Sequence, residues 1–337
     1  MTSARPQVIR LPVADEWPHA AAPDADWQES VVLAFQDVTQ AVGGFIRIGH
    51  HPNRGTGNCT FGVVSQAGGF NRSHQATPMR PGDRGERRFA IDGFLAAEFG
   101  DGYSRWAASD ADCELDLEVT DLHPLYDTWA LSGLTGGFRQ NFAASHTEVA
   151  GRARGRLRIG DEHWAVEGFG YRDHSWGVRR MDDPESALAN FFWLVGAFGE
   201  DFVFALVEIV LRRGKRTKMG FIIKDGAFDI PRVTDLSFVT ELDGLCLRGA
   251  RCRFETDRLG TFEFDVEGFG NVLLGMEQRY LEFGMPGVVR WGERAGGAHL
   301  STLFNARNGE ARPPLLFGGS QDNGLYARLQ FAAASAS

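Results

Sequence analysis

The sequence has few cysteines: four occur among 337 residues, and no two of them form a Cys-x-x-Cys pair. Closely spaced thiolates are the usual donors of structural zinc sites, so we expect no zinc site of this kind. The wide spacing of Cys59, Cys113, Cys246 and Cys252 favours free, buried thiols in a reducing compartment. The N-terminus lacks the basic start and apolar run of a secretory signal peptide, which favours a cytoplasmic location.

Long apolar runs and an excess of basic residues are also missing. Because no apolar stretch is long enough to span a bilayer, we expect no stable membrane insertion. The formal net charge of -9 argues against a broad nucleic-acid-binding surface and against strong docking to anionic lipid. Both observations indicate a protein that works on neither nucleic acids nor membranes.

Glycine and phenylalanine are abundant instead, with 42 Gly and 26 Phe, and long helical periodicity is missing. This composition favours antiparallel β structure. Apolar and charged residues alternate over 113–120, 152–159 and 262–267, as in strands with one face in a core and one in water. The alternate arginines of 152–158 could form an anion-binding stripe. We favour a solvated face paired with the acidic residues of 114–118, because opposite charges on neighbouring strands attract.

Turn signals separate these runs and predict tight hairpins. They combine glycine with an acidic residue or asparagine, at 160–161, 199–201, 225–226, 243–244, 308–309 and 323–324. Strands therefore arrive about every 10 to 15 residues, which is typical of a barrel or sandwich. We predict a flexible lead-in over 1–27, an N-terminal β domain over 28–165 and a C-terminal β domain over 166–332, with one short helix at 184–189.

The most informative stretch, residues 168–179, reads Gly-Phe-Gly-Tyr-Arg-Asp-His-Ser-Trp-Gly-Val-Arg. Successive side chains of an extended strand point to opposite faces. One face then carries Tyr171 and Asp173, and the other carries His174 and Trp176. We predict that the imidazole and the indole project together into a hollow with an acid in reach, and that all four side chains serve proton transfer to a ligand.

Three other interpretations of this stretch compete with proton chemistry. A Ser-His-Asp hydrolase is disfavoured, because adjacent strand residues diverge and no Gly-x-Ser-x-Gly elbow surrounds Ser175. Metal binding is disfavoured, because the adjacent histidines at 50–51 cannot easily share one ion and the other histidines lack an evident carboxylate ligand set. The third interpretation is structural and stays open: Asp173 caps backbone amides while Trp176 plugs the end of a barrel.

A second candidate acid lies in residues 202–210, which read Phe-Val-Phe-Ala-Leu-Val-Glu-Ile-Val. Glu208 is the sole ionisable group of this strand, and burial raises the pKa of a carboxyl group toward the neutral range that a general acid needs. An ion pair between Glu208 and an arginine of another strand is an equally open alternative. Nearby aromatic residues suit either a core or the wall of a cavity that stabilises a passing cation. The substrate-binding candidates are Phe191, Phe192, Trp193, Phe204, Tyr280 and Glu282.

Part of this stretch resembles the signature of the carotenoid 1,2-hydratase (hydroxyneurosporene synthase) and AttH-like superfamily. The matching block is Gly168-x-Gly170-Tyr171-x-Asp173-His174-x-Trp176-Gly177. Fungal kievitone hydratase and the lipocalin-like Diels-Alderases look like distant members. The resemblance is specific at this block and fades elsewhere. It implies an all-β fold of two lipocalin-like antiparallel β-barrels packed side by side.

The resemblance also implies site residues. In the hydratases a His-x-Trp pair, a Tyr and an Asp from a later strand are thought to serve the reaction. Here His174 and Trp176 match the first pair, whereas the later Tyr-x-Asp is not evident and the comparable strand offers Phe204 and Glu208. A chain of this kind could keep the fold and change the reaction.

We therefore expect a cofactor-independent acid/base enzyme that acts on a carbon-carbon double bond of a hydrophobic isoprenoid or polycyclic small molecule. Hydration, dehydration, isomerisation and cyclisation all fit. The expected catalytic residues are Tyr171, Asp173, His174, Trp176 and Glu208, with Asp173 or Glu208 as the proton donor. A non-catalytic carrier of lipophilic molecules is the alternative, and a purely structural module predicts no cavity. We expect no metal and no nucleic-acid partner, and the oligomeric state stays open.

Overall fold

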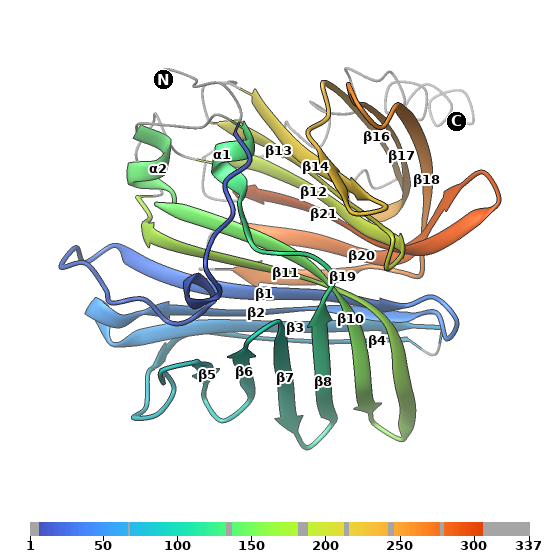
Figure 1. The fold of residues 1–337 in the computed structure, drawn as a ribbon. Coiled ribbons are helices and arrows are strands. Elements are labelled where there is room, and N and C mark those ends of the chain that lie inside the picture. Colours follow the sequence, from blue (N-terminus) through green and yellow to red (C-terminus); the bar gives the residue numbers. More distant parts are fainter. Residues whose placement is uncertain are drawn as a thin grey trace, which may run out of the picture.

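The computed structural model of the protein describes residues 7–66, 68–132, 137–180, 188–211, 216–241, 246–276 and 280–305. Nearly all regular structure in these residues is β, arranged as two curled antiparallel sheets that lie one above the other in Figure 1. The predicted all-β fold of two lipocalin-like barrels packed side by side is confirmed. No helix among the described residues is long and apolar enough to cross a membrane.

The first sheet, at the bottom of Figure 1, contains 11 of the described strands. They are β1 (Trp27–Asp37), β2 (Val42–His51), β3 (Thr56–Ser65), β4 (Gly68–Pro78), β5 (Arg88–Ile91), β6 (Leu95–Gly100), β7 (Tyr103–Asp110), β8 (Cys113–Asp121), β9 (Tyr126–Asp127), β10 (Ser145–Ile159) and β11 (Glu162–Val178). Their order is β4-β3-β2-β1-β11-β10-β8-β7-β6-β5, and β9 pairs with β10 beside this path. The motif strand β11 therefore lies between β1 and β10.

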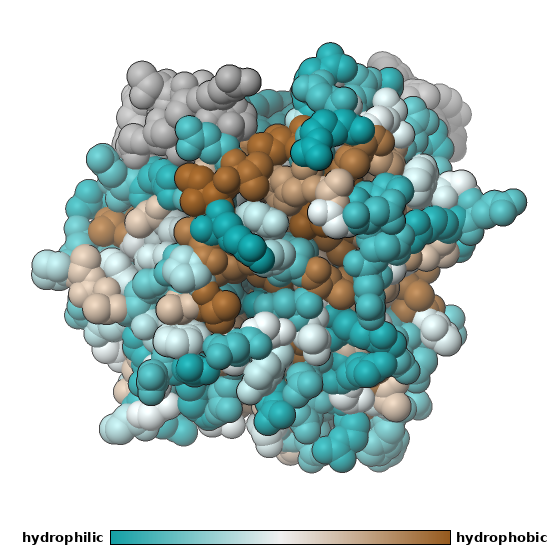
Figure 2. Space-filling view, viewed as in Figure 1, coloured by the Kyte–Doolittle hydropathy of each residue, from teal (hydrophilic) through white to brown (hydrophobic). Residues whose placement is uncertain are grey.

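The second sheet contains 10 of the described strands. They are β12 (Leu188–Gly199), β13 (Phe202–Leu211), β14 (Arg216–Lys224), β15 (Ala227–Asp229), β16 (Val233–Thr240), β17 (Leu247–Glu255), β18 (Thr261–Gly268), β19 (Val272–Met276), β20 (Tyr280–Trp291) and β21 (Arg294–Asn305). Their order is β15-β14-β13-β12-β21-β20-β18-β17-β16, and β19 pairs with β20. On the face shown in Figure 2, hydrophobic residues gather over β13 and β14, whereas the first barrel is mostly hydrophilic.

Three hydrophobic clusters form the core of the described chain, one inside each curled sheet and one between the sheets. A single strand contributes side chains to two clusters, one on each of its faces. Val31 of β1 points into the first barrel and Val32 toward the second sheet, while Phe192 of β12 points into the second barrel and Trp193 toward the first sheet. Because both faces of these strands are buried, they read as continuous apolar runs instead of alternating ones.

The strands predicted from alternating residues are confirmed. In β8 and β18 the apolar residues are buried and the charged residues between them are exposed. The register places the arginines of β10 opposite the acidic residues of β8, and Arg156 lies 3.4 Å from Asp116. Arg158 lies 3.2 Å from Glu114. The arginine stripe is therefore a solvated face paired with acidic residues, as favoured from the sequence.

Three of the predicted hairpin turns lie in described residues, at 160–161, 199–201 and 225–226. In the last of these, Asp225 and Gly226 have φ values of 52° and 75°. Positive φ at both central residues matches the twist of a tight hairpin, which explains the Asp-Gly pair. The predicted turns at 243–244, 308–309 and 323–324 lie outside the described residues.

The chain passes from the first sheet to the second between Val178 and Leu188. The predicted boundary between residues 165 and 166 falls inside β11, which pairs with β1 and β10 along its length. We therefore propose that the N-terminal domain extends to Val178 and includes the whole motif. Of the predicted helix at 184–189, residues 188–189 belong to β12 and the rest lies outside the described residues.

Four short helices of the described chain lie outside the sheets. They are η1 (Val13–Glu16), η2 (Pro52–Arg54), α1 (Thr128–Ser132) and α2 (Gly137–Asn141). Of these, α1 packs against both β10 of the first sheet and β14 of the second. Glu16 of η1 is buried, pairs with Arg172 of β11 at 2.9 Å, and accepts a hydrogen bond from Thr147 at 3.0 Å. These contacts differ from the loosely held lead-in expected over 1–27, because a buried charge pair ties the segment to β11.

Candidate functional site

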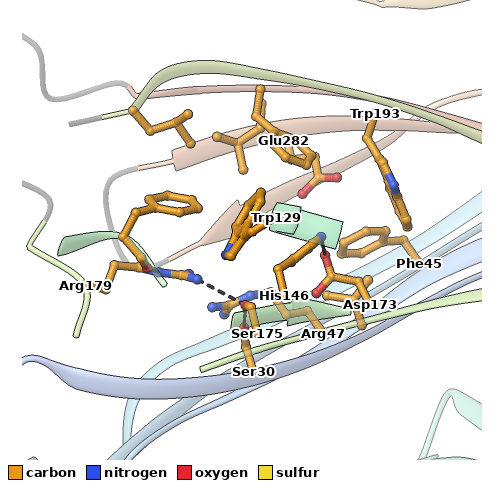
Figure 3. A pocket seen from close by; sticks show the side chains of 15 residues that line it. Ser30, Phe45, Arg47, Trp129, His146, Asp173, Ser175, Arg179, Trp193 and Glu282 are labelled. Atoms are coloured by element: carbon orange, nitrogen blue, oxygen red, sulfur yellow. Dashed lines mark hydrogen bonds and ion pairs between the residues drawn. The ribbon is translucent and has the colours of Figure 1, made fainter. Parts of the chain in front are cut away.

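A pocket lies between the two barrels (Figure 3). The space not filled by protein atoms is about 690 Å³, a volume that includes open solvent at its mouth. Most of the lining is aromatic or aliphatic: Val32, Phe45, Trp129, Phe142, Leu188, Phe191, Trp193 and Leu303. The polar lining residues are Ser30, Arg47, His146, Asp173, Ser175, Arg179 and Glu282.

The first barrel contributes a linked acid/base group to this pocket. The Nε2 atom of His146 on β10 lies 3.1 Å from Glu148 Oε1 and 3.5 Å from Asp173 Oδ2. Behind them, the Tyr171 hydroxyl donates a hydrogen bond to Glu148 Oε2 at 3.2 Å. The register pairs Glu148 with Asp173, so alternate residues of β10 and β11 share the face toward the second barrel. The indole of Trp129 stacks on the His146 ring at 4.5 Å and holds it in place.

Burial and neighbouring charges set the protonation of this group. Burial lowers the pKa of His146, but the carboxylates of Asp173 and Glu148 outweigh burial and raise it above the ordinary value. Burial raises the pKa of Asp173, an effect that His146 opposes and Glu148 reinforces. The imidazole of His146 and the carboxyl group of Asp173 can therefore share a proton. Of the side chains in this group, Asp173 is the best candidate for a general acid or base.

Glu282 faces this group from the second barrel (Figure 3). It lies on β20 and is 3% exposed. Burial and the charge of Asp173 raise the pKa of Glu282 to about 7, against the opposing effects of the Ser301 hydrogen bond and the Arg47 charge. A carboxyl group with this pKa holds a proton part of the time at neutral pH and can donate or accept one. Carboxyl groups with a raised pKa therefore lie on both walls of the pocket.

His174 and Trp176 lie on the other face of β11, toward the interior of the first barrel. Their ring centroids are 4.9 Å apart, so they share a face as predicted. His174 is 1% exposed and packs against the rings of Phe89 and Phe99, and neither motif residue lines the pocket. The prediction that both rings project into the ligand cavity does not hold for this pocket. Because neighbours on a strand alternate, Asp173 enters the pocket only if His174 turns away from it.

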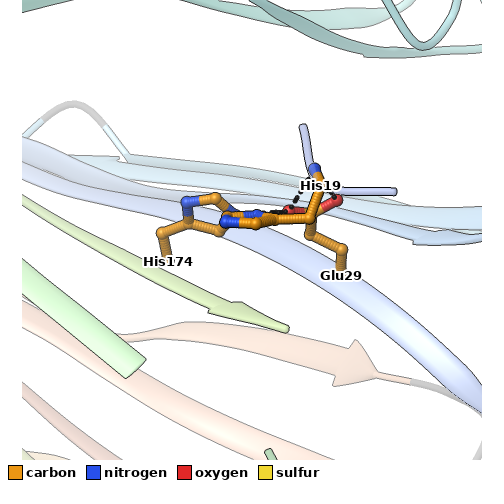
Figure 4. Close-up of side chains that lie close together, drawn as sticks. All are labelled: His19, Glu29 and His174. Atoms are coloured by element: carbon orange, nitrogen blue, oxygen red, sulfur yellow. Dashed lines mark hydrogen bonds and ion pairs between the residues drawn. The ribbon is translucent and has the colours of Figure 1, made fainter. Parts of the chain in front are cut away.

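His174 belongs to a polar cluster around Glu29 (Figure 4). One Glu29 oxygen, Oε1, lies 3.0 Å from His174 Nε2 and 2.7 Å from His19 Nδ1. The other, Oε2, pairs with Arg84, and the His19 ring stacks on Trp176 at 3.9 Å. This Glu29 cluster joins the N-terminal segment to β1 and β11.

The Glu29 cluster is expected to make the protein sensitive to acid. Burial raises the pKa of Glu29, but hydrogen bonds from His174 and His19 and the charge of Arg84 outweigh burial and hold it well below the ordinary value of 4.5. Such a group contributes stability that is complete above the unfolded pKa and is lost as the pH falls toward the folded pKa. We expect the free energy of unfolding to decrease below about pH 4.5, and Glu29→Gln to remove most of this decrease. Urea denaturation at a series of pH values measures both curves, and parallel curves would contradict the assignment.

Solved structures share this two-barrel fold at low sequence identity. A protein of Nitrosomonas europaea named as an AttH (NE1406) has a TM-score of 0.62 and 13% identity, with 90% of this chain and 98% of that chain covered. CghA, solved with Sch210972, has a TM-score of 0.59 and 10% identity, with 83% and 89% covered. Kievitone hydratase from Nectria haematococca has a TM-score of 0.56 and 10% identity, with 87% and 92% covered. The likeness shows the fold, which is the two-barrel fold that the motif resemblance implied.

Residues 12–306 match a family model described as Domain of unknown function (DUF7064). The chain belongs to this family. The matched range includes both barrels and every residue that lines the pocket. No curated protein shows significant similarity to this DUF7064 chain.

The predicted substrate-binding residues of this DUF7064 chain divide between the pocket and the second barrel. Three of them line the pocket: Phe191, Trp193 and Glu282. Phe192 and Phe204 belong to the core of the second barrel, because they occupy the opposite face of their strands. The side chain of Tyr280 lies outside the described residues.

Glu208, predicted as an alternative acid, lies away from the pocket lining. It is 3% exposed and forms ion pairs with Arg216 at 3.4 Å and Lys218 at 4.0 Å. This is the ion-paired alternative considered for Glu208. Asp173 and Glu282 are therefore the carboxyl groups that the DUF7064 fold brings to the pocket.

Two groups of described residues each place three metal-ligating side chains within 4.8 Å of one another: His19–Glu29–His174 and His146–Glu148–Asp173. Imidazole and carboxylate donors together suit several divalent metals. In the first group Arg84 already pairs with Glu29, and its charge opposes a second cation. In the second group the raised pKa of His146 favours a protonated imidazole, which does not bind metal. Both groups therefore fit ion-paired clusters better than metal sites.

Sequence reasoning missed His146 and Glu148, which complete the acid/base group. A signal was present, because residues two apart in a strand share a face, and this spacing places two titratable side chains together at the start of β10. No comparable signal marked His19, because the segment around it shows no periodicity.

Proposed function

We propose that this protein is an acid/base enzyme that acts on a carbon-carbon double bond of a hydrophobic small molecule, of isoprenoid or polycyclic type, held between its barrels. The supporting observation is the position of Asp173 and His146, 3.5 Å apart, in a pocket lined mainly by aromatic and aliphatic side chains. The apolar walls favour a lipophilic ligand and limit access of water. One structural neighbour is named a hydratase, which agrees with this reaction class.

Asp173 is the proposed proton donor to carbon. In the hydration direction its carboxyl proton adds to one alkene carbon, and the neighbouring carbon becomes cationic. Water then adds to the cation and gives up a proton to a base of the pocket; dehydration reverses these steps. The faces of Phe45 and Trp193 in the lining are positioned to stabilise the cation. Isomerisation and cyclisation begin with the same protonation.

Tyr171 and Glu148 act behind His146, because the Tyr171 hydroxyl holds Glu148 and Glu148 holds the imidazole. The proposed steps move protons and water without net oxidation or reduction, so we propose a reaction that is independent of a cofactor. His174 and Trp176 then serve the reaction indirectly, by fixing β11 through the Glu29 cluster.

Filling the pocket is expected to block ligand binding. Leu303 lines the pocket and is 8% exposed, so Leu303→Trp places a larger ring in the ligand space. We expect the affinity for the neutral fluorescent probe N-phenyl-1-naphthylamine to fall by at least about tenfold. Leu281→Trp is the matched control, because Leu281 is 36% exposed and lies outside the lining. Equal probe affinity in both variants would place the ligand elsewhere.

A further inference from the structure

Glu282 is backed by two polar residues that the proposed function does not use. His299 Nε2 lies 2.9 Å from the Ser301 hydroxyl, and Ser301 hydrogen-bonds to Glu282. Both residues lie two apart on β21, which pairs with β20 and so brings them beside Glu282. All three are almost inaccessible, at 3% exposure for Glu282 and 0% for the other two. Burying a row of polar groups in an apolar sheet costs stability for each group without a partner, so we infer that these residues have a role.

The hydrogen bonds from His299 through Ser301 to Glu282 run in one direction, from donor to acceptor. Burial lowers the pKa of His299 to about 3, so the ring is neutral at physiological pH. Its Nδ1 atom has no hydrogen-bond partner among the described residues. Because a buried N–H without a partner is rarer than an unpaired acceptor, we assign the proton to Nε2. Nε2 then donates to Ser301 Oγ, which leaves the Ser301 hydroxyl proton to donate to Glu282.

The His299 ring is also held against the pocket wall. It stacks on Phe45 of the first sheet at 5.7 Å and meets Trp193 of β12 edge-on at 5.7 Å. Both rings line the pocket. The hydrogen-bonded residues behind Glu282 are therefore fixed at the contact between the barrels. Glu282 itself faces the pocket from the wall opposite Asp173 (Figure 3).

We propose that Glu282, positioned by Ser301 and His299, is a second proton-transfer residue that acts on the ligand face opposite to Asp173. This inference rests on the proposed function and specifies it further. In dehydration Asp173 takes the proton from carbon, Glu282 gives a proton to the hydroxyl oxygen, and the carbon–oxygen bond breaks. The electron pair of the carbon–hydrogen bond becomes the new double bond, and water leaves from the opposite face. The substrates of this site are then alcohols, or the corresponding alkenes, whose hydrogen and hydroxyl lie anti to each other.

The hydrogen-bond chain has a role in this step. After Glu282 gives up its proton, its carboxylate is left in a buried, largely apolar site, which is costly. The Ser301 hydroxyl donates to that carboxylate, and the neutral His299 polarises the hydroxyl without adding a charge. The charged groups that face Glu282 are Asp173 from β11 and Arg47 from β2, and their effects on the carboxylate are opposite in sign.

Titration of Glu282 in the protein without substrate tests whether Ser301 and His299 act on its pKa. Infrared difference spectra across neutral pH are expected to show a protonated carboxyl band that Glu282→Gln removes and the control Glu208→Gln retains. Losing a hydrogen bond to a charged group shifts a pKa by about one to two units, so Ser301→Ala is expected to raise the midpoint of this band by about one pH unit or more. His299→Leu is expected to raise it too, whereas His299→Gln, which keeps a donor, restores it in part. A Glu282 band missing at neutral pH, or a midpoint unmoved in Ser301→Ala, overturns the proposal.

Turnover separates this proposal from the proposed function. Loss of turnover in both Asp173→Asn and Glu282→Gln supports the pair, and product formed in D₂O is expected to carry deuterium anti to the hydroxyl. Turnover lost in Asp173→Asn but retained in Glu282→Gln leaves the proposed function standing and overturns the role of Glu282. Turnover retained in both variants overturns the two together.

Discussion

Replacing Asp173 with asparagine is expected to lower turnover about 10²- to 10⁴-fold, the usual contribution of one general acid or base. Asparagine keeps the size of the side chain but cannot supply a transferable proton, so the loss falls on kcat. Probe affinity is expected to stay nearly constant, because His146 keeps its 3.1 Å contact with Glu148. Mass spectrometry of a panel of lipophilic alkenes and alcohols measures turnover as gain or loss of water, or as deuterium uptake at carbon in D₂O.

Glu208→Gln is the matched control for this experiment. It makes the same exchange of carboxyl for amide at a buried residue of the second barrel, outside the pocket, where Glu208 pairs with Arg216. Turnover retained in this variant and lost in Asp173→Asn supports the assignment. An Asp173→Asn protein that binds the probe and keeps full turnover would show that another residue is the acid. A wild-type protein that binds the panel and converts none of it favours the carrier.

Replacing Arg172 with methionine is expected to destabilise the first barrel by about 3 to 5 kcal/mol, the cost of breaking a buried ion pair from one side. Arg172 is 4% exposed, and its Nη1 and Nη2 atoms each lie 2.8 Å from an oxygen of Asp121. Its Nε atom lies 2.9 Å from Glu16. Burial already raises the pKa of Asp121 against the opposing charge of Arg172, so removing the guanidinium leaves the buried Glu16 carboxylate and the half-buried Asp121 carboxylate without a cation.

Arg156→Met is the control variant, because it shows how much stability is lost when an exposed arginine is replaced by methionine. Arg156 pairs with Asp116 on the outer face of β10, where the two side chains are 82% and 69% exposed. Exposed pairs of this kind contribute little, so the urea midpoint is expected to stay at the wild-type value. Urea denaturation at neutral pH, followed by tryptophan fluorescence, compares the variants. Equal midpoints for Arg172→Met and Arg156→Met would contradict the buried role of Arg172.

Strand positions were predictable where a strand has one face in a core and one in water. Residues 113–120 alternate for this reason, and the structure places them in β8. The boundary between the domains was less accessible. Residue 166 follows a hairpin and looks like the start of a new unit, but β11 returns to pair with β10 and β1. Strand pairing depends on distant residues, so the local turn signal did not reveal it.

The candidate site was predictable in its residue types and only partly in its arrangement. The motif identified Asp173 as an acid and placed His174 on the opposite face of the strand, because side chains alternate. Alternation does not say which face lies inside the barrel. Curling of the first sheet turns His174 inward, toward Phe89, and leaves Asp173 facing the second barrel. Glu282 was predicted to bind substrate, but nothing near it in the sequence indicates that Asp173 lies across from it.

The sequence by itself determined the β content, the strand rhythm and the motif, because alternation and turn preferences act between residues that are close in the chain. Only the tertiary structure decided which residues meet. Asp173, His146 and Glu282 come from β11, β10 and β20, and they share one pocket because two curled sheets pack with their outer faces together. Their protonation is likewise a tertiary property, since burial and charges from other strands set each pKa.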